Sequence, residues 1–262
     1  DSQRVAVDSV AANELLSGNV QTVDATVEVG GYTFDFEQLV VDKNGNGMLS
    51  YTISNPDGVK DWYESGYGEI NFNWYSNPNG GLVDPTIYSE SGEELDSRLL
   101  LRSDISTDTE LHVVACFTGN LQENEGIRLD LIKAKGQWTV LDQKSVSFDA
   151  TDKLDGIALT DENGDTAEVS PIGLTMSDTA DENIENVPDN ITLKYTDGTE
   201  YVIDGEDAYN TIVSLKDSGK SWYVFNRLVD TGKIQSLDIK GHYCNLEDES
   251  QENYDRIYTI AK

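Results

Sequence analysis

The chain has 262 residues, enough for one large domain or two of ordinary size, so a core can form without metals or disulfides. Its 49 Asp and Glu residues against 18 Lys and Arg give a net charge of −31. Such a surface repels phosphates, so neither nucleic acid nor an anionic membrane surface is expected as a partner. It suits a protein that stays soluble outside the cell.

The acidic residues are spread along the whole chain. Divided after Lys153, the sequence has 26 acidic and 10 basic residues in its first part, and 23 and 8 in its second. Hydrophobic residues also run throughout. The charge therefore indicates the acidic surface of folded domains and not an acidic disordered tail.

The first half reads as a short helix followed by strands. Apolar residues and alanines predict a helix over residues 4–16, within an N-terminal stem of residues 1–19. Two segments rich in Gly, Asn, Ser and Pro, 55–69 and 76–108, are expected to be loops. Runs typical of β-strands occur at 20–29, 32–41, 48–53, 69–75, 111–117, 127–133, 138–141 and 146–148.

The β pattern restarts at Leu154, after a polar linker at 149–153. Short strands separated by Gly, Asn and Asp turns are typical of β-sandwiches. We therefore predict an all-β protein of two β-sandwich domains, at 20–150 and 154–262. The second set of strands is expected at 157–160, 167–170, 173–176, 191–195, 200–203, 222–225, 234–239 and 254–260.

The segment Asp42-Lys43-Asn44-Gly45-Asn46-Gly47 matches the first half of a calcium-binding EF-hand loop. That loop needs a bidentate Glu at its twelfth position, where this chain has Ile53, and strand-like runs flank it. A hairpin turn is favoured over a calcium site. The segment 161–165 leads to the same interpretation, and no metal site or cofactor is expected.

No motif identifies a catalytic residue. The histidines His112 and His242 lie in or beside strand-like runs without metal-ligand spacing, and Cys116 and Cys244 are expected to be free thiols rather than a disulfide. A glycan-active hydrolase would need two carboxylates facing each other across a cleft, which no sequence signal marks. We therefore predict that the chain is not an enzyme.

Aromatic residues gather between positions 62 and 75, interleaved with Gly, Asn and Ser. Aromatic rings on polar loops can stack on sugars or peptides. The alternative is that Phe72 and Trp74 belong to the core of a strand. Within the loop part, Trp62, Tyr63 and Tyr67 are the candidate ligand-binding residues.

The run GGYTFDFEQLVVDKNGNGMLSYTISN, at residues 30–55, carries a family resemblance. It resembles the first hairpin of a family of unknown function, the exported ectodomains of Gram-positive anti-sigma-factor-like membrane proteins. Three later segments resemble their C-terminal immunoglobulin-like domain: SPIGLTM (170–176), ITLKYTDGTEYVI (191–203) and FNRLVDTGKIQSLDIKG (225–241).

The resemblance implies an extracellular, cell-surface location and an anchor in the membrane through a segment that this chain does not contain. It implies a sensing or interaction domain, which binds an envelope protein or glycan and carries out no catalysis. The family supplies no catalytic residues. A carbohydrate-binding or adhesin-type surface module is the alternative, and it depends on the aromatic cluster.

Overall fold

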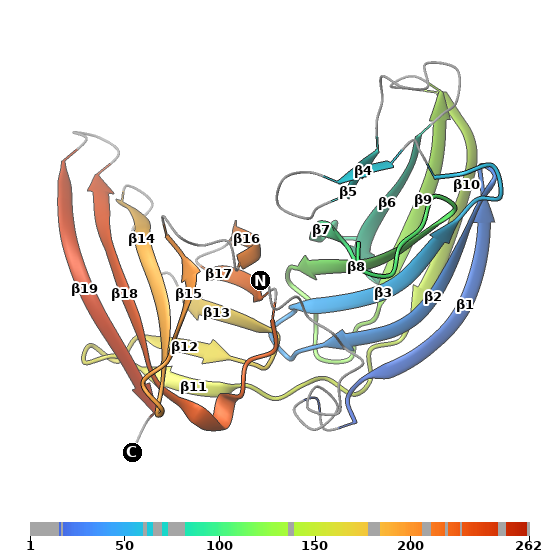
Figure 1. The fold of residues 1–262 in the computed structure, drawn as a ribbon. Helices are drawn as coiled ribbons and strands as arrows, with labels where there is room; N and C mark the ends of the chain where they lie inside the picture. The colour runs from blue at the N-terminus through green and yellow to red at the C-terminus, as the bar shows by residue number, and fades with distance from the viewer. Residues whose placement is uncertain are drawn as a thin grey trace. The chain divides into compact units, whose positions relative to one another are not determined.

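A computed structural model describes residue 16 and residues 18–59, 62–64, 70–72, 82–135, 139–177, 184–205, 211–217, 220–225, 227–245 and 250–260 (Figure 1). The chain divides into two compact units. The first unit comprises residues 18–153, and the second comprises residues 154–262 together with 1–17.

The first unit is built from antiparallel strands in two larger sheets and one small hairpin. One sheet has the order β1-β2-β3-β8-β7, the other has the order β10-β9-β6, and β4 pairs with β5. The strands are β1 (Gln21–Val29), β2 (Tyr32–Val41), β3 (Gly47–Ser54), β4 (Trp62–Glu64), β5 (Ile70–Phe72), β6 (Leu82–Ser89), β7 (Asp96–Leu101), β8 (Glu110–Thr118), β9 (Ile127–Lys135) and β10 (Thr139–Phe148).

The core of the first unit lies between its two larger sheets. Alternation along β2 places Tyr32, Phe34 and Phe36 on one buried face, as the sequence predicts. The rings of Phe36 and Phe148, one from each sheet, meet edge to face with centroids 5.2 Å apart. Leu129 and Leu131 of β9 complete the same cluster. Buried side chains from both sheets therefore form one sandwich core.

A β-bulge interrupts the alternation of β2. Phe36 pairs with Tyr51 and Gln38 pairs with Ser50, which leaves Glu37 as the extra residue. Bulges re-aim side chains and switch the buried positions by one residue. Leu39 consequently faces the core three residues after Phe36.

The second unit consists of one continuous sheet with the order β15-β14-β18-β19-β11-β12-β13-β17-β16. Its one short 3-10 turn among the described residues is η1 (Thr231–Lys233). The strands are β11 (Ile157–Thr160), β12 (Thr166–Val169), β13 (Gly173–Ser177), β14 (Ile184–Tyr195), β15 (Glu200–Asp204), β16 (Thr211–Asp217), β17 (Lys220–Phe225), β18 (Ile234–Asn245) and β19 (Gln251–Ile260).

This sheet curls around its own core. Tyr201 on the edge strand β15 packs against Phe225 of β17, near the opposite edge, with ring centroids 5.4 Å apart. The two halves of the sheet are joined through β11 and β19, which share the pairs Leu159 with Ile260 and Thr160 with Thr259. The two layers expected of an immunoglobulin-like domain are here two halves of one sheet, because β19 pairs with β11 and so joins the two sets of strands.

The all-β prediction is confirmed, and its errors are local. The expected loops over 55–69 and 76–108 are wrong, because the first contains β4 and the second contains β6 and β7. Pro85 and neighbouring polar residues hid β6, which lies at the edge of its sheet, where proline is tolerated. The predicted helix over 4–16 lies outside the described residues, apart from Leu16. In the described part of the chain, no helix is long and apolar enough to cross a membrane.

Candidate functional site

The aromatic ligand candidates are only partly covered by the structure. Trp62 and Tyr63 lie on β4, where they pair with Phe72 and Asn71 of β5. The orientation of their side chains is not described, and Tyr67 lies outside the described residues. The hypothesis that these three residues bind a ligand stays a prediction.

The turn that resembles an EF-hand loop is a hairpin turn between β2 and β3, as predicted. The Asp42 side chain is fully buried, and its Oδ1 accepts hydrogen bonds from the N–H groups of Asn44 and Asn46 at 2.8 and 2.9 Å. Its Oδ2 accepts one from the Asn46 amide at 2.9 Å. Thr118 of β8 donates to Asn46 Oδ1 at 2.9 Å. The carboxylate thus holds its own loop in place.

The second turn of this kind joins β11 to β12. Asp161 Oδ1 accepts from the N–H groups of Asn163 and Asp165, both at 2.9 Å. Here the closing residue is Arg256 of β19, whose Nη1 lies 2.6 Å from Asp165 Oδ2 and 3.9 Å from Asp161 Oδ2. Both carboxylates that the motif suggested as cation ligands therefore have structural roles.

Arg256 also organises a cluster of tyrosines on β18 and β19. Its guanidinium donates to the hydroxyl of Tyr243 and lies over the rings of Tyr243 and Tyr254, 5.6 and 5.3 Å from their centroids. The two rings lie 4.8 Å apart. Burial and the neighbouring Tyr243 raise the pKa of Tyr254 far above its usual value. The cluster fastens β19 to β18 and to the β11–β12 turn.

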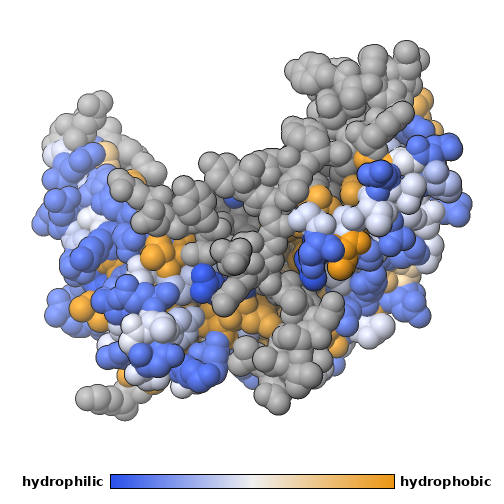
Figure 2. All heavy atoms as spheres, in the orientation of Figure 1, coloured by the Kyte–Doolittle hydropathy of each residue, from blue (hydrophilic) through white to orange (hydrophobic). Residues whose placement is uncertain are grey.

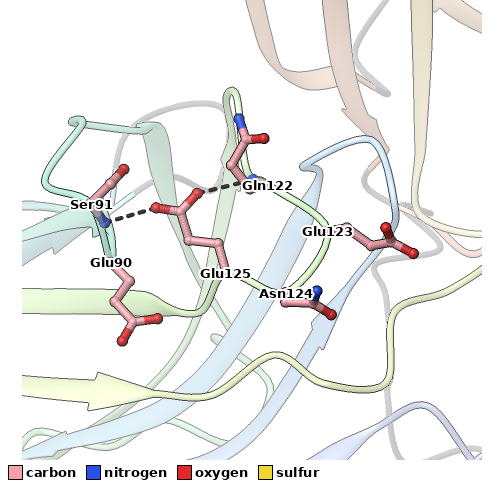
Figure 3. Close-up of a pocket in the computed structure, with 6 residues that line it drawn as sticks. All are labelled: Glu90, Ser91, Gln122, Glu123, Asn124 and Glu125. Carbon is pink, nitrogen blue, oxygen red and sulfur yellow. Dashed lines mark hydrogen bonds between the residues drawn. The ribbon is translucent and has the colours of Figure 1, made fainter.

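An open hollow of about 580 Å³ lies between two loops of the first unit (Figure 3). It is lined by Glu90, Ser91, Gln122, Glu123, Asn124 and Glu125. The buried carboxylate of Glu125 accepts hydrogen bonds from the N–H groups of Ser91 at 2.7 Å and Gln122 at 2.9 Å. In Figure 3, Glu90 and Glu123 extend away from it. Glu125 therefore ties the two loops together, and Glu90 adds a hydrogen bond that it accepts from the Gly126 N–H at 3.5 Å.

Burial alone would raise the pKa of Glu125, but the hydrogen bonds from Ser91 and Gln122 outweigh it and lower that pKa. Lys153 lies nearby and donates to the Gln122 carbonyl at 2.5 Å. Burial lowers the pKa of Lys153, and the charges of Glu125 and Asp42 partly offset this effect. No sequence signal marks Glu125 or Lys153, since their contacts join segments 31 to 34 residues apart.

The two cysteines are free thiols, and each of the two histidines lies beside a carboxylate. Cys116 and Cys244 are free thiols, and burial raises the pKa of Cys116 to about 12. His242 lies 3.2 Å from an oxygen of Asp189, and His112 lies 3.0 Å from an oxygen of Glu110. Among the described residues, no three His, Cys, Asp or Glu side chains are grouped to hold a metal ion.

The surface is dominated by polar groups over much of the face shown in Figure 2. Large apolar side chains are exposed on three segments within the described ranges. They are Ile105, Val140, Leu141, Ile257 and Ile260.

No family model and no curated protein matches the chain. Among solved structures, it is similar to a conserved domain protein from Bacillus anthracis, with 11% identity, 95% of this chain and 94% of that chain covered, and a TM-score of 0.48. It is more distantly similar to the CupB6 tip adhesin from Pseudomonas aeruginosa, with 11% identity, 90% and 94% covered, and a TM-score of 0.13. Likenesses at this level identify no family and no activity.

Proposed function

We propose that this chain is the extracellular sensing and interaction domain of an anti-sigma-factor-like membrane protein, and that it acts by binding a partner and not by catalysis. The observation that carries this proposal is the use of its buried carboxylates. Asp42, Asp161 and Glu125 each hold backbone N–H groups of their loops. Each of these carboxylates is engaged in holding its own loop, and the lowered pKa of Glu125 makes that group a poor general acid.

The environment of Cys116 also supports a binding role without catalysis. Cys116 is buried, and a raised pKa leaves little reactive thiolate at neutral pH. The exposed residue Glu123, on one of the loops that Glu125 joins, presents a carboxylate to solvent. A rigid β scaffold that presents charged loops is a common arrangement for recognition.

The cellular test is a deletion in the organism that carries the chain. Removing the segment that encodes residues 18–262 from the parent gene should change transcription that depends on the sigma factor encoded beside it. A reporter for that sigma factor measures the effect, and re-expression of the intact gene is the control. Unchanged reporter activity under envelope stress would contradict the proposal.

A biochemical test separates binding from catalysis and a glycan partner from a protein partner. The purified chain is titrated with peptidoglycan fragments and common glycans, while tryptophan fluorescence reports binding and a reducing-end assay reports cleavage. We expect no new reducing ends. A saturable fluorescence change that disappears in Trp62→Ala would support the carbohydrate-binding alternative, and newly formed reducing ends would contradict a purely binding role.

A further inference from the structure

Three neighbouring strands of the first unit bring a hydroxyl, an imidazole and two carboxylates together on one face of a sheet. Thr52 of β3 pairs directly with His112 of β8. Glu37 is the extra residue in the bulge of β2, and Glu110 precedes His112 by two positions on β8. Residues next to Thr52 and His112 face the core, so these side chains lie on the opposite face.

The distances place the four groups in one hydrogen-bonded row. His112 Nε2 lies 3.0 Å from Glu110 Oε1, and His112 Nδ1 lies 3.2 Å from Thr52 Oγ1. Thr52 Oγ1 also lies 3.2 Å from Glu37 Oε1. The Thr52 hydroxyl therefore stands between the imidazole and the bulge carboxylate, within hydrogen-bond distance of both.

The protonation state of His112 decides where the hydroxyl proton points. An ionised Glu110 only accepts, so the proton of a neutral imidazole sits on Nε2 and Nδ1 is an acceptor. The Thr52 hydroxyl then donates to Nδ1. In the imidazolium form Nδ1 also carries a proton and donates to Thr52 Oγ1, which leaves the hydroxyl proton for Glu37.

Because Thr52 is buried, its hydroxyl donates either to His112 or to Glu37. Thr52 is only 7% exposed, so its hydroxyl has little access to water as a third partner. The side chains of His112 and Glu110 are 27% and 48% exposed, so protons from solvent reach the imidazole. We propose that Thr52 is a proton-controlled relay, which passes the protonation state of His112 to the Glu37 carboxylate in the β2 bulge.

The other charged groups around the row have partners of their own. Asp35 of β2, opposite Thr52, accepts a hydrogen bond from Thr26 of β1 at 2.6 Å. Arg102, whose N–H bonds to the His112 carbonyl, forms a two-point pair with Asp104 at 3.0 Å. The charges of these groups contribute to the electrostatic potential at His112, but the link between His112 and Glu37 depends on the Thr52 hydroxyl.

Solution NMR of the whole chain tests the relay. The side-chain nitrogens of His112 and the carboxyl carbon of Glu37 are followed between about pH 5 and pH 8, where histidine titrates. We expect the Glu37 carbon to show an inflection at the same midpoint as His112. In Thr52→Val this inflection should disappear while His112 still titrates.

Matched variants separate the relay from a simple field effect. Thr26→Val removes a similar hydroxyl–carboxylate bond on the same sheet that contacts no histidine, and it should leave the Glu37 inflection unchanged. Thr52→Ser keeps a hydroxyl and should retain the inflection, and Thr52→Ala serves as the second hydroxyl-free variant if valine perturbs the fold. An inflection that persists without the hydroxyl, or is absent from the unmodified chain, would overturn the proposal.

Discussion

The two units contain the same turn in different surroundings. Asp42-Lys43-Asn44-Gly45-Asn46 and Asp161-Glu162-Asn163-Gly164-Asp165 share the pattern Asp-x-Asn-Gly followed by a polar residue. In both, the N–H of the first residue donates to the carbonyl of the fifth, at 2.8 and 3.1 Å. The glycines have φ angles of +93° and +89°. The local sequence therefore determines the turn itself.

The surroundings of the two turns differ. The first turn is packed against the segment around Gly119, and Thr118 closes it from inside the protein. The second turn is open at its tip, where Asn163 and Gly164 are exposed, and the long side chain of Arg256 closes it from β19. Equivalent substitutions should therefore have unequal effects, and hydrogen exchange of amides in each unit can measure them separately.

The largest difference is expected for the glycines. In Gly45→Ala the new Cβ would collide with the carbonyl oxygen of Gly119 in a conformation that already disfavours side chains. We expect a loss of roughly 3 to 5 kcal/mol in the first unit. Gly164→Ala meets nothing within 4 Å, so only the left-handed backbone opposes it, at about 1 to 2 kcal/mol in the second unit. Equal losses would contradict the comparison.

Replacing the aspartates should give a smaller difference in stability loss than replacing the glycines, again with the larger loss in the first unit. Asp42→Ala leaves the half-buried N–H of Asn44 and the buried N–H of Asn46 without their acceptor, which should cost about 3 kcal/mol. Asp161→Ala removes the acceptor of the corresponding donors beside the exposed tip of the second turn, where water can replace it, and we expect about 1 to 2 kcal/mol. Urea unfolding followed by unit-specific amide signals measures both, with Asp57→Ala in an exposed loop as the control.

The residues that close the two turns, Arg256 and Thr118, make different kinds of interaction, so their substitutions should differ in size and in salt dependence. Arg256→Met removes the ion pairs with Asp165 and Asp161 and the contacts with tyrosine, for an expected loss of about 2 kcal/mol. Thr118→Val removes one buried neutral hydrogen bond, for about 1 kcal/mol. Added salt should reduce the difference between Arg256→Met and the unmodified chain, because it screens ion pairs, and should leave the Thr118→Val difference unchanged. A salt-independent Arg256 effect would mean that packing dominates.

The smallest effect is expected from Glu125, a loop-tying carboxylate for which the second turn has no described counterpart. Its lowered pKa means that the anion is favoured by folding, so this stabilisation is present above its unfolded value, near pH 4.3. It is lost as the pH falls through the folded pKa. Glu125→Gln should reduce the acid dependence of the first unit's stability and leave that of the second unit unchanged. Unfolding free energies measured at several acidic pH values test this, and parallel profiles would contradict it.

The sequence by itself determined the all-β class and the turns. Alternating apolar residues and Asn-Gly turns act over a few residues, so they indicate strands and hairpins wherever they occur. The buried face of Tyr32, Phe34 and Phe36 and the hairpin at Asp42 follow from such local preferences.

Only the tertiary structure decided which strands joined one sheet and which polar groups met. Arg256 and Asp165 are 91 residues apart, and Thr118 and Asn46 are 72 apart, so no local pattern links them. The strand β6 escaped prediction because Pro85 and its polar neighbours mask the strand pattern, and only its pairing with β9 places it in a sheet. Contacts of this kind form only when packing brings distant segments together, and the same packing gives two similar turns different surroundings.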